Sequence, residues 1–368
     1  MPEQKAIDRL LLTILDDEVS DIHFKAGCSP IIRRAGIIVH RQEIPPLQTE
    51  HVERLVRELV TARQAEKFAE GEELDLGHSL PGHARFRVNI YSQRGTPAIA
   101  MRRIPYDIPK IDDLGLPEVV KRIALEPRGL VLVTGVTGSG KSTTLAAMVD
   151  HINQNRCAHI VTIEDPIEFL HRDVKSTISQ REVGIDTPSW SRALRAVFRQ
   201  DPDVILIGEM RDAETIATAL TGAETGHLVF STLHTGDAAE TVSRIIDVFP
   251  SQQQQLVRLQ LGQLLAGVIS QRLLPGTKPD TLVLASEVLV HSSTIQECIA
   301  DPQKGHLIPR TMEASYAQYG MQTFDMALHR LIVEGRISRE TALAAATHPT
   351  ALDLRLKGVE TASDWRME

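Results

Sequence analysis

The spacing of apolar residues predicts a small α+β unit in the first hundred residues. Apolar side chains recur at helical spacing across residues 6–15, whereas residues 84–91 alternate between apolar and polar, as in a half-buried strand. Arg94-Gly95 then makes a turn into a partner strand. The expected elements are a helix over 6–15, strands over 21–25 and 31–41 with a break at Ala35-Gly36, a helix over 49–68, and strands over 84–91 and 96–103. We predict a domain of sheet plus helices over residues 1–103.

A proline-rich stretch separates this unit from the rest of the chain. Residues 104–117 contain Pro105, Pro109 and Pro117, a density that indicates a stiff, non-helical linker. Beyond it, short apolar runs alternate with helical segments, which is typical of a parallel sheet with crossover helices. The expected strands cover residues 129–134, 159–163, 204–207, 227–233 and 281–288, and a helical region covers 323–348. This pattern predicts an α/β domain over residues 118–350, followed by a tail over 351–368.

A glycine-rich loop follows the first strand of the second domain. The segment Gly135-Val136-Thr137-Gly138-Ser139-Gly140-Lys141-Ser142 matches G-x-x-x-x-G-K-[ST] at every fixed position. Glycines let successive N–H groups curl around a phosphate, and the helix that begins here directs its positive end at the same anion. Lys141 is expected on the β- and γ-phosphates of ATP, and Ser142 on Mg²⁺. The predicted nucleotide-binding residues are Gly135, Thr137, Gly138, Ser139, Gly140, Lys141, Ser142 and Thr143.

Two further strands end in acidic residues, which a hydrolytic site needs near Mg²⁺ and near the attacking water. Glu164 follows the strand at 159–163, and Glu209 follows the apolar run at 204–207 through Gly208, where an aspartate is commoner. The carboxyl ends of parallel strands line the crevice where ligands bind. Glu164 and Glu209 are therefore candidate catalytic groups, and Glu209 is also a candidate metal ligand. A solvated acid after a strand is the ordinary alternative for either residue.

Histidines stand at both ends of the strand at 227–233. His234 follows its carboxyl end and is the better candidate to contact the γ-phosphate, whereas His227 opens the strand and lies nearer its far end. We count both as candidate catalytic residues, the alternative being a histidine that serves only packing or the surface.

Composition narrows the class of protein. Hydrophobic residues make up 42% of the 368 and charged residues 24%, as in ordinary globular proteins. The net charge of −8 disfavours a nucleic-acid partner, and two tryptophans with four tyrosines offer few platforms for base stacking. Three widely spaced cysteines cannot form a disulfide framework, so we expect a reducing compartment, the cytoplasm. No apolar stretch approaches the ~18 residues of a membrane span.

Together these motifs resemble the PilT/PilU family of type IV pilus retraction ATPases, within the secretion ATPase superfamily. The resemblance covers about residues 5–345 and includes the acidic box at 162–168 and the two-histidine strand. The other segments that carry it are Ser20-Asp21-Ile22-His23, Arg85-Phe86-Arg87-Val88-Asn89, Gln180-Arg181-Glu182-Val183-Gly184, Arg199-Gln200-Asp201-Pro202-Asp203, Gly208-Glu209-Met210-Arg211-Asp212, Val268-Ile269-Ser270-Gln271-Arg272-Leu273 and Gly320-Met321-Gln322-Thr323.

The resemblance implies a PAS-like N-terminal α+β domain and a C-terminal RecA-like doubly wound P-loop ATPase domain. It implies a homohexamer with nucleotide between the domains, in which ATP hydrolysis with Mg²⁺ moves the two domains. The implied partners are an inner-membrane pilus platform protein and, as a further candidate, a second retraction ATPase, with the ring docked peripherally at the membrane. It suggests that Glu164 acts on the attacking water and Glu209 on Mg²⁺, although the reverse assignment and a role for Glu168 stay open.

Several arginines are candidates to reach a neighbouring subunit's nucleotide, where an added cation stabilises phosphoryl transfer. Arg85 lies on the polar face of its strand and Arg94 at the next turn. Arg195 and Arg199 share one face of an expected helix over 190–200. The family resemblance adds Arg103, near the base and ribose. Solvated faces or interface salt bridges are the alternative for all five.

One departure from the family affects the predicted role. Retraction ATPases carry Ala-Ile-Arg-Asn-Leu-Ile-Arg near the C-terminus, where this chain has residues 294–300, Thr-Ile-Gln-Glu-Cys-Ile-Ala, without either arginine. An accessory or regulatory paralogue of the motor is therefore the main alternative. A nucleic-acid motor is the more distant one, because other RecA-like rings act on DNA.

Overall fold

The computed structural model describes residues 5–16, 18–34, 36–104, 107–279 and 281–358. The chain divides into two compact units. Unit 1 comprises Met1–Asp107 and Pro166–Leu170, and unit 2 comprises Ile108–Asp165 and His171–Glu368. Pro105 of the predicted linker lies outside the described residues. The boundaries that the sequence suggests for the domains, linker and tail remain predictions.

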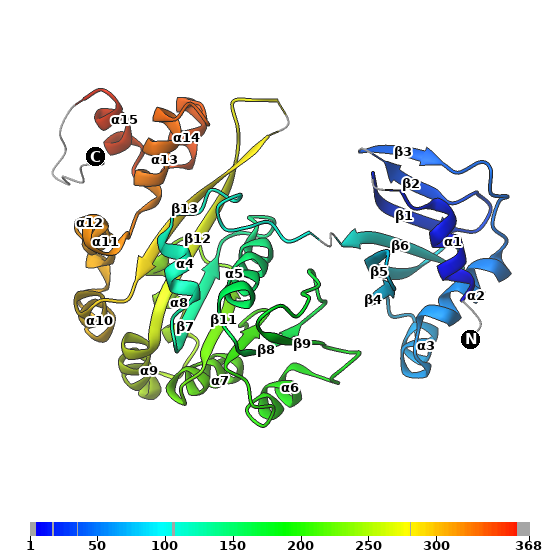
Figure 1. Ribbon diagram of the computed structural model, residues 1–368, viewed down its shortest axis with the longest axis horizontal. Coiled ribbons are helices and arrows are strands. Elements are labelled where there is room, and N and C mark those ends of the chain that lie inside the picture. Colours follow the sequence, from blue (N-terminus) through cyan, green and yellow to red (C-terminus); the bar gives the residue numbers. More distant parts are fainter. Residues whose placement is uncertain (1–4, 17, 35, 105–106, 280, 359–368) are drawn as a thin grey trace. The chain divides into compact units, whose positions relative to one another are not determined.

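Unit 1 is an antiparallel sheet with helices, in agreement with the expected α+β character (Figure 1). The six strands lie in the order β3-β2-β1-β6-β5-β4. Its elements are α1 (Ala6–Ile14), β1 (Val19–Lys25), β2 (Ile31–Arg34), β3 (Ile37–His40), α2 (Thr49–Leu59), α3 (Ala62–Ala69), β4 (Leu74–Leu80), β5 (Ala84–Gln93) and β6 (Thr96–Ile104).

The core of unit 1 follows the predicted alternation. Phe86, Val88 and Ile90 of β5 are fully buried, while Arg87 between them is exposed. The expected helix over 49–68 is wrong in one respect, because it is two helices. Thr61 interrupts it by capping α3: its hydroxyl accepts from the Gln64 N–H, and its own N–H donates to Gln64 Oε1. The strand β4 was not anticipated by the sequence pattern.

Unit 2 is a seven-stranded sheet in the order β13-β12-β7-β11-β10-β8-β9. All neighbours pair in parallel except β12 with β13. Its elements are α4 (Val119–Ala124), β7 (Gly129–Thr134), α5 (Lys141–Asn155), β8 (His159–Glu164), β9 (Thr177–Glu182), α6 (Trp190–Val197), β10 (Val204–Ile207), α7 (Ala213–Glu224), β11 (Leu228–Leu233), α8 (Ala238–Asp247), α9 (Ser251–Leu264), β12 (Leu265–Pro275), β13 (Leu282–Val290), α10 (Ser293–Ala300), η1 (Gly305–Leu307), α11 (Ile308–Ala314), α12 (Tyr316–Tyr319), α13 (Phe324–Val333), α14 (Arg339–Ala345) and α15 (Pro349–Leu356).

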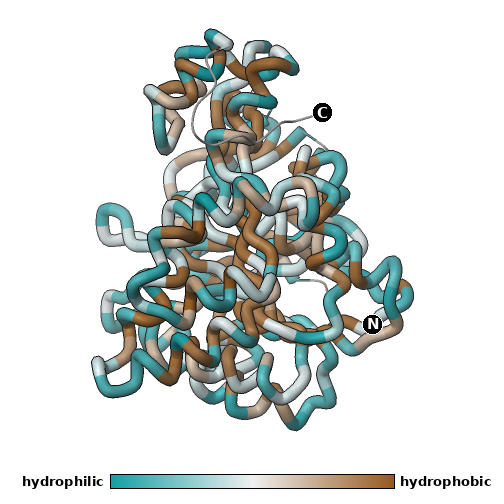
Figure 2. Tube along the Cα trace, turned by 90° about the vertical axis from the view of Figure 1, so that its left-hand side faces the viewer, coloured by the Kyte–Doolittle hydropathy of each residue, from teal (hydrophilic) through white to brown (hydrophobic). Residues whose placement is uncertain are grey.

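Helices cover both faces of this sheet, as the α/β pattern predicts. Leu130 and Leu132 of β7 pack in a core with α6 to α10, whereas Val131 and Val133 pack with α4 and α5 on the opposite face. In Figure 2, apolar segments run through the middle of unit 2 and hydrophilic ones lie on its outer loops. Because β7 is buried on both faces, it reads as a continuous apolar run rather than an alternating one.

Other details of unit 2 differ from the sequence expectations. The predicted bounds of β7 and β10 match the structure, but β9 and β12 were not anticipated. The expected helix over 190–200 ends at Val197, so Arg199 lies beyond it rather than on a helical face shared with Arg195. The predicted tail begins inside α15. In the described part of the chain, the helices are too short or too polar to traverse a bilayer.

Candidate nucleotide site

Four segments of unit 2 meet at the carboxyl edge of the sheet. Strands β7, β11, β10 and β8 are parallel neighbours in that order. The glycine-rich loop follows β7, His234 follows β11, Glu209 lies two residues beyond β10, and Glu164 ends β8. The fold thus places three candidate catalytic residues and the loop along one edge, where α/β sheets bind ligands.

The loop after β7 has the backbone of an anion cradle. Gly135, Gly138 and Gly140 have φ values of 143°, 80° and 89°, which glycine adopts without steric cost. Gly140 caps α5, whose first turn carries Lys141, Ser142 and Thr143. Thr137 and Gly138 are exposed. The helix therefore begins at the end of the loop, with its free N–H groups available to a phosphate.

Lys141 is held at the loop. Its Nζ donates hydrogen bonds to the carbonyl oxygens of Gly135 and Val136, at 2.9 and 3.0 Å. Its charge also lowers the pKa of Glu209, which places the two side chains in one electrostatic environment. An ammonium group beside this cradle is suited to the β- and γ-phosphates.

The back of the loop rests on β12. A Cβ on Gly135 would lie 2.5 Å from the backbone oxygen of Gln271 and 2.6 Å from Ser139 Oγ. The Gln271 side chain donates to Thr144 Oγ1 of α5, at 2.6 Å. Gln271 therefore braces the loop and its helix, and only glycine fits at position 135.

Glu164 accepts two hydrogen bonds from side chains of neighbouring strands. Its Oε1 accepts from Thr162 Oγ1 at 2.6 Å and from Gln180 Nε2 at 3.2 Å. Thr162 lies on β8 and Gln180 on its neighbour β9. These hydrogen bonds orient the carboxylate.

Glu209 contacts the guanidinium of Arg211 and the imidazole of His234. Arg211 Nη2 donates to Glu209 Oε2 at 2.8 Å, and His234 Nε2 lies 3.3 Å from Glu209 Oε1. Partial burial works to raise the pKa of Glu209, but the hydrogen bond and charge of Arg211 outweigh it, with smaller help from His234 and Lys141. The pKa of Glu209 is consequently lowered, so this carboxylate is suited to binding cations and is a weak proton acceptor.

The backbone of His171, a partly buried residue, supports Gln180 and through it Glu164. The backbone N–H of His171 donates to Gln180 Oε1 at 2.9 Å, and Gln180 Nε2 in turn donates to Glu164. Burial lowers the pKa of His171 to about 4. The imidazole is therefore neutral in the folded protein at neutral pH.

This histidine should make the protein lose stability in mild acid. Between pH 6.5 and about 4 the unfolded chain binds a proton at His171 that the folded chain does not, so stability falls as pH falls through this window. From pH 7.5 to 5 the loss is about 2 kcal/mol. We expect His171→Gln to reduce the drop in melting temperature between these pH values by several degrees relative to wild type. Equal drops in both proteins would contradict the assignment.

His227 lies away from the loop. It precedes β11 at the amino end of the strand, which pairs with the start of β7. Its Nδ1 is 3.0 Å from the Gly222 carbonyl oxygen, and its ring packs at 5.6 Å from that of Phe198. Within this chain the structure does not bring His227 to the other site residues, and its contacts are those of a packing residue.

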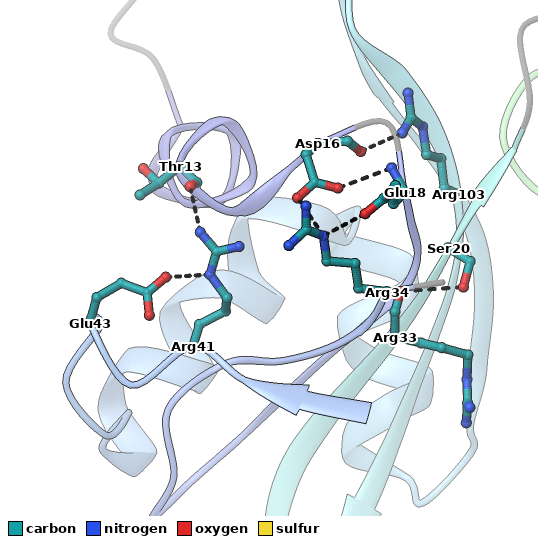
Figure 3. A network of polar contacts seen from close by, with 9 residues as sticks. All are labelled: Thr13, Asp16, Glu18, Ser20, Arg33, Arg34, Arg41, Glu43 and Arg103. Atoms are coloured by element: carbon teal, nitrogen blue, oxygen red, sulfur yellow. Dashed lines mark hydrogen bonds and ion pairs between the residues drawn. The ribbon is translucent and has the colours of Figure 1, made fainter. Parts of the chain in front are cut away.

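The arginine candidates are divided between the two units. In unit 1, Arg85 Nη1 donates to Ser79 Oγ, Arg94 occupies the β5–β6 turn with φ 51°, and Arg103 donates to the Asp16 carbonyl oxygen (Figure 3). In unit 2, Arg195 forms an exposed ion pair with Glu214 of α7, at 2.9 Å. Arg199 is exposed. The roles of all five remain predictions.

Sequence reasoning did not assign three residues of this edge. Gln180 and Arg211 fall within quoted family segments, yet their contacts with Glu164 and Glu209 depend on β9 and on a loop. Gln271 also lies in such a segment, on the unanticipated strand β12. The family segments were the only sequence signal that could have indicated them.

The donor set at this edge fits a magnesium nucleotide. Mg²⁺ is usually held by one or two protein oxygens together with substrate phosphates. Ser142 offers a hydroxyl at the start of α5, and Glu209 offers a carboxylate whose pKa is lowered. Among the described residues, no three His, Cys, Asp or Glu side chains form a metal site of their own. The fold and the site define a P-loop nucleotide-binding protein.

Comparison with known proteins assigns the family. Residues 1–317 match the family described as Type II/IV secretion system protein, and the chain belongs to this family. It is 45% identical over 343 residues to the type IV pilus retraction ATPase PilT of Pseudomonas aeruginosa, covering 93% of this chain and 98% of the relative. It is 38% identical over 358 residues to the type IV pilus ATPase PilU of the same organism, covering 97% and 93%.

A solved structure shares the whole fold. The crystal structure of the pilus retraction motor PilT with bound ADP superposes with a TM-score of 0.85 at 43% identity, covering 95% of this chain and 99% of that chain. The match bears out an N-terminal domain followed by a RecA-like P-loop ATPase domain.

Proposed function

We propose that this chain is the ATP-hydrolysing motor of type IV pilus retraction. The observation that carries the proposal is the shared edge of unit 2, where a phosphate loop, two differently held carboxylates and His234 lie at the ends of neighbouring strands. The similarity to PilT over nearly the whole chain supports the same function.

In the proposed mechanism the two glutamates have different tasks. Lys141 binds the β- and γ-phosphates, while Ser142 and Glu209 hold Mg²⁺, which neutralises phosphate charge when bound. Glu164 orients the attacking water and accepts its proton, and the hydrogen bonds from Thr162 and Gln180 hold its carboxylate in place. His234, beside Glu209, contacts the γ-phosphate.

We further propose that the working form is a homohexamer with Mg²⁺-ATP bound between domains of adjacent subunits. Arg85 and Arg94 of a neighbouring N-terminal domain then supply the cations that phosphoryl transfer requires, and Arg103 approaches the base and ribose. Arg195 and Arg199 are the alternative source of such cations. The linker over 104–117 lets the N-terminal domain, 1–103, move against the ATPase domain, 118–350.

The proposed partner is an inner-membrane pilus platform protein, with which a cytoplasmic ring makes a peripheral contact. Hydrolysis then turns the platform and withdraws pilin subunits. A second retraction ATPase is a further proposed partner, in line with the similarity to PilU.

The native mass tests the ring. With Mg²⁺ and a non-hydrolysable ATP analogue, light scattering should give six copies of 40.7 kDa, about 244 kDa. A particle of this size would make the arginines proposed to reach a neighbouring subunit's nucleotide the next targets for substitution. A stable monomer at micromolar concentration would contradict the interfacial site.

A specific observation favours a second candidate, an accessory ATPase. Residues 294–300, which lack the two arginines of the family signature, lie in α10. An accessory protein would show near-zero turnover alone and would regain activity with a partner motor.

A further inference from the structure

The start of α13 contacts two adjacent strands of unit 2. Phe324, the first residue of α13, is fully buried. Its backbone N–H donates to Glu287 Oε2 of β13 at 3.4 Å, and the Arg272 guanidinium of β12 lies 3.8 Å from the centre of its ring. The C-terminal helices are therefore fixed to the sheet by both a hydrogen bond and a cation–π contact.

The other oxygen of Glu287 holds a different helix. Oε1 accepts from the backbone N–H of Ala238, the first residue of α8, at 2.8 Å. Glu287 is only 6% exposed, and a buried carboxylate is costly unless hydrogen-bonded. One side chain thus satisfies free N–H groups at the starts of α8 and α13, where the helix dipoles also favour negative charge.

The start of α8 leads directly to the nucleotide site. Three residues, 235–237, separate Ala238 from His234, whose ring contacts Glu209. The conformation of this turn is restricted by two hydrogen bonds to α8. Thr235 Oγ1 hydrogen-bonds Thr241 Oγ1, and the Gly236 N–H donates to Glu240 Oε2, both at 2.6 Å. A shift of the first turn of α8 would accordingly move His234.

We propose that Glu287 is a positioning residue that couples the nucleotide site to the C-terminal helices, by fixing the start of α8 and the start of α13 to one carboxylate. The inference rests on the proposed nucleotide function. The C-terminal helices then respond when nucleotide occupies the site, and their position sets that of His234.

A second connection runs through β12. Arg272, which stacks on Phe324 and hydrogen-bonds the Ala345 carbonyl oxygen of α14, is adjacent in sequence to Gln271. Gln271 braces Thr144 behind the phosphate loop. Neighbouring residues of one strand therefore contact the C-terminal helices and the loop helix, and Phe324 is where the two connections meet.

Hydrogen exchange of the full chain, with and without Mg²⁺ and a non-hydrolysable ATP analogue, tests the coupling. Burial raises the pKa of Glu287 to about 7, aided by Asp237 and opposed by its N–H donors and Arg272, so pH 8 keeps the carboxylate ionised. In wild type, the ATP analogue should slow exchange both in the phosphate loop and, at least about threefold, at residues 321–333. In Glu287→Gln, whose amide oxygen can accept from only one of the two N–H groups, the loop should still respond but residues 321–333 should not.

Ser286→Ala is the matched control. Ser286 Oγ also accepts a buried hydrogen bond, but from Gln322 and not from the start of α8. This variant should keep the remote response. In steady-state kinetics Glu287→Gln should lower kcat about fivefold or more with KM for ATP within about twofold, whereas Ser286→Ala should change neither.

The outcomes separate the two proposals. If nucleotide slows exchange in the phosphate loop of the wild type but not at residues 321–333, the coupling is overturned. This outcome is measured on the wild type alone and does not depend on whether a variant folds. A remote response that persists in Glu287→Gln overturns the role of Glu287. Absence of protection at the loop itself overturns the nucleotide function, and the coupling with it.

Discussion

Replacing Glu164 by glutamine is expected to lower kcat for ATP hydrolysis by about 10²–10⁴-fold, the usual contribution of a general base. Glutamine keeps the side-chain length and an oxygen that can accept from Thr162 or Gln180, so the fold around β8 and β9 should survive. The nucleotide dissociation constant should stay within about threefold, because Glu164 is placed at the attacking water and not on the phosphates.

The measurement is steady-state turnover beside equilibrium nucleotide binding, with Asp165→Asn as the matched control. Asp165 follows Glu164 directly, is exposed, and acts only weakly on the charge of Arg211. Its neutralisation should change kcat by no more than about threefold. If Glu164→Gln turned over like wild type, Glu164 would have no part in the chemistry and Glu209 would become the candidate base.

The second large effect is expected at Gly135. An alanine there must adopt φ near 143° with its Cβ 2.5 Å from the Gln271 backbone oxygen, which cannot move without shifting β12. Strain of about 1–3 kcal/mol from the backbone alone is typical of such positions. The loop should therefore rearrange, and Gly135→Ala should weaken ADP binding by about tenfold or more and lower the melting temperature of the nucleotide-free protein.

Gly138→Ala provides the comparison within the same loop. Gly138 also has positive φ, but a Cβ added there would meet nothing within 4 Å, so the cost is limited to about 1–2 kcal/mol of left-handed backbone strain. Melting curves and calorimetric titration with ADP, compared between Gly135→Ala and Gly138→Ala, show whether the contact with β12 adds to the backbone strain. Equal losses of melting temperature in the two variants would mean that the contact with β12 does not shape the loop.

In unit 2, the strands that are buried on both faces of the sheet could be predicted from the sequence. β7 and β10 are unbroken apolar runs, and their bounds were predicted correctly. β9 was not predicted because Thr177–Glu182 contains a single strongly apolar residue. Its strand conformation depends on pairing with β8 rather than on its own hydrophobic pattern. Propensity cannot anticipate a strand that its neighbour imposes.

In the candidate site, too, some features could be predicted from the sequence and others could not. Parallel strands must end at one edge, so acids and a histidine directly after three strands could be expected near the loop without knowing the strand order. The partners of those acids could not, because Gln180 reaches Glu164 only once β9 lies beside β8. The two histidines, by contrast, could be separated from the sequence alone, because His227 opens the strand and His234 follows its carboxyl end, and the structure shows the same placement.

Whether this chain drives retraction can be measured by imaging labelled pili on cells of the source organism whose chromosomal copy of this chain carries Glu164→Gln. We expect that pili still extend but that retraction events fall at least tenfold relative to the Asp165→Asn strain, since turnover is reduced by about 10²-fold or more. Retraction at the same frequency and speed in both strains would contradict a motor driven by this site.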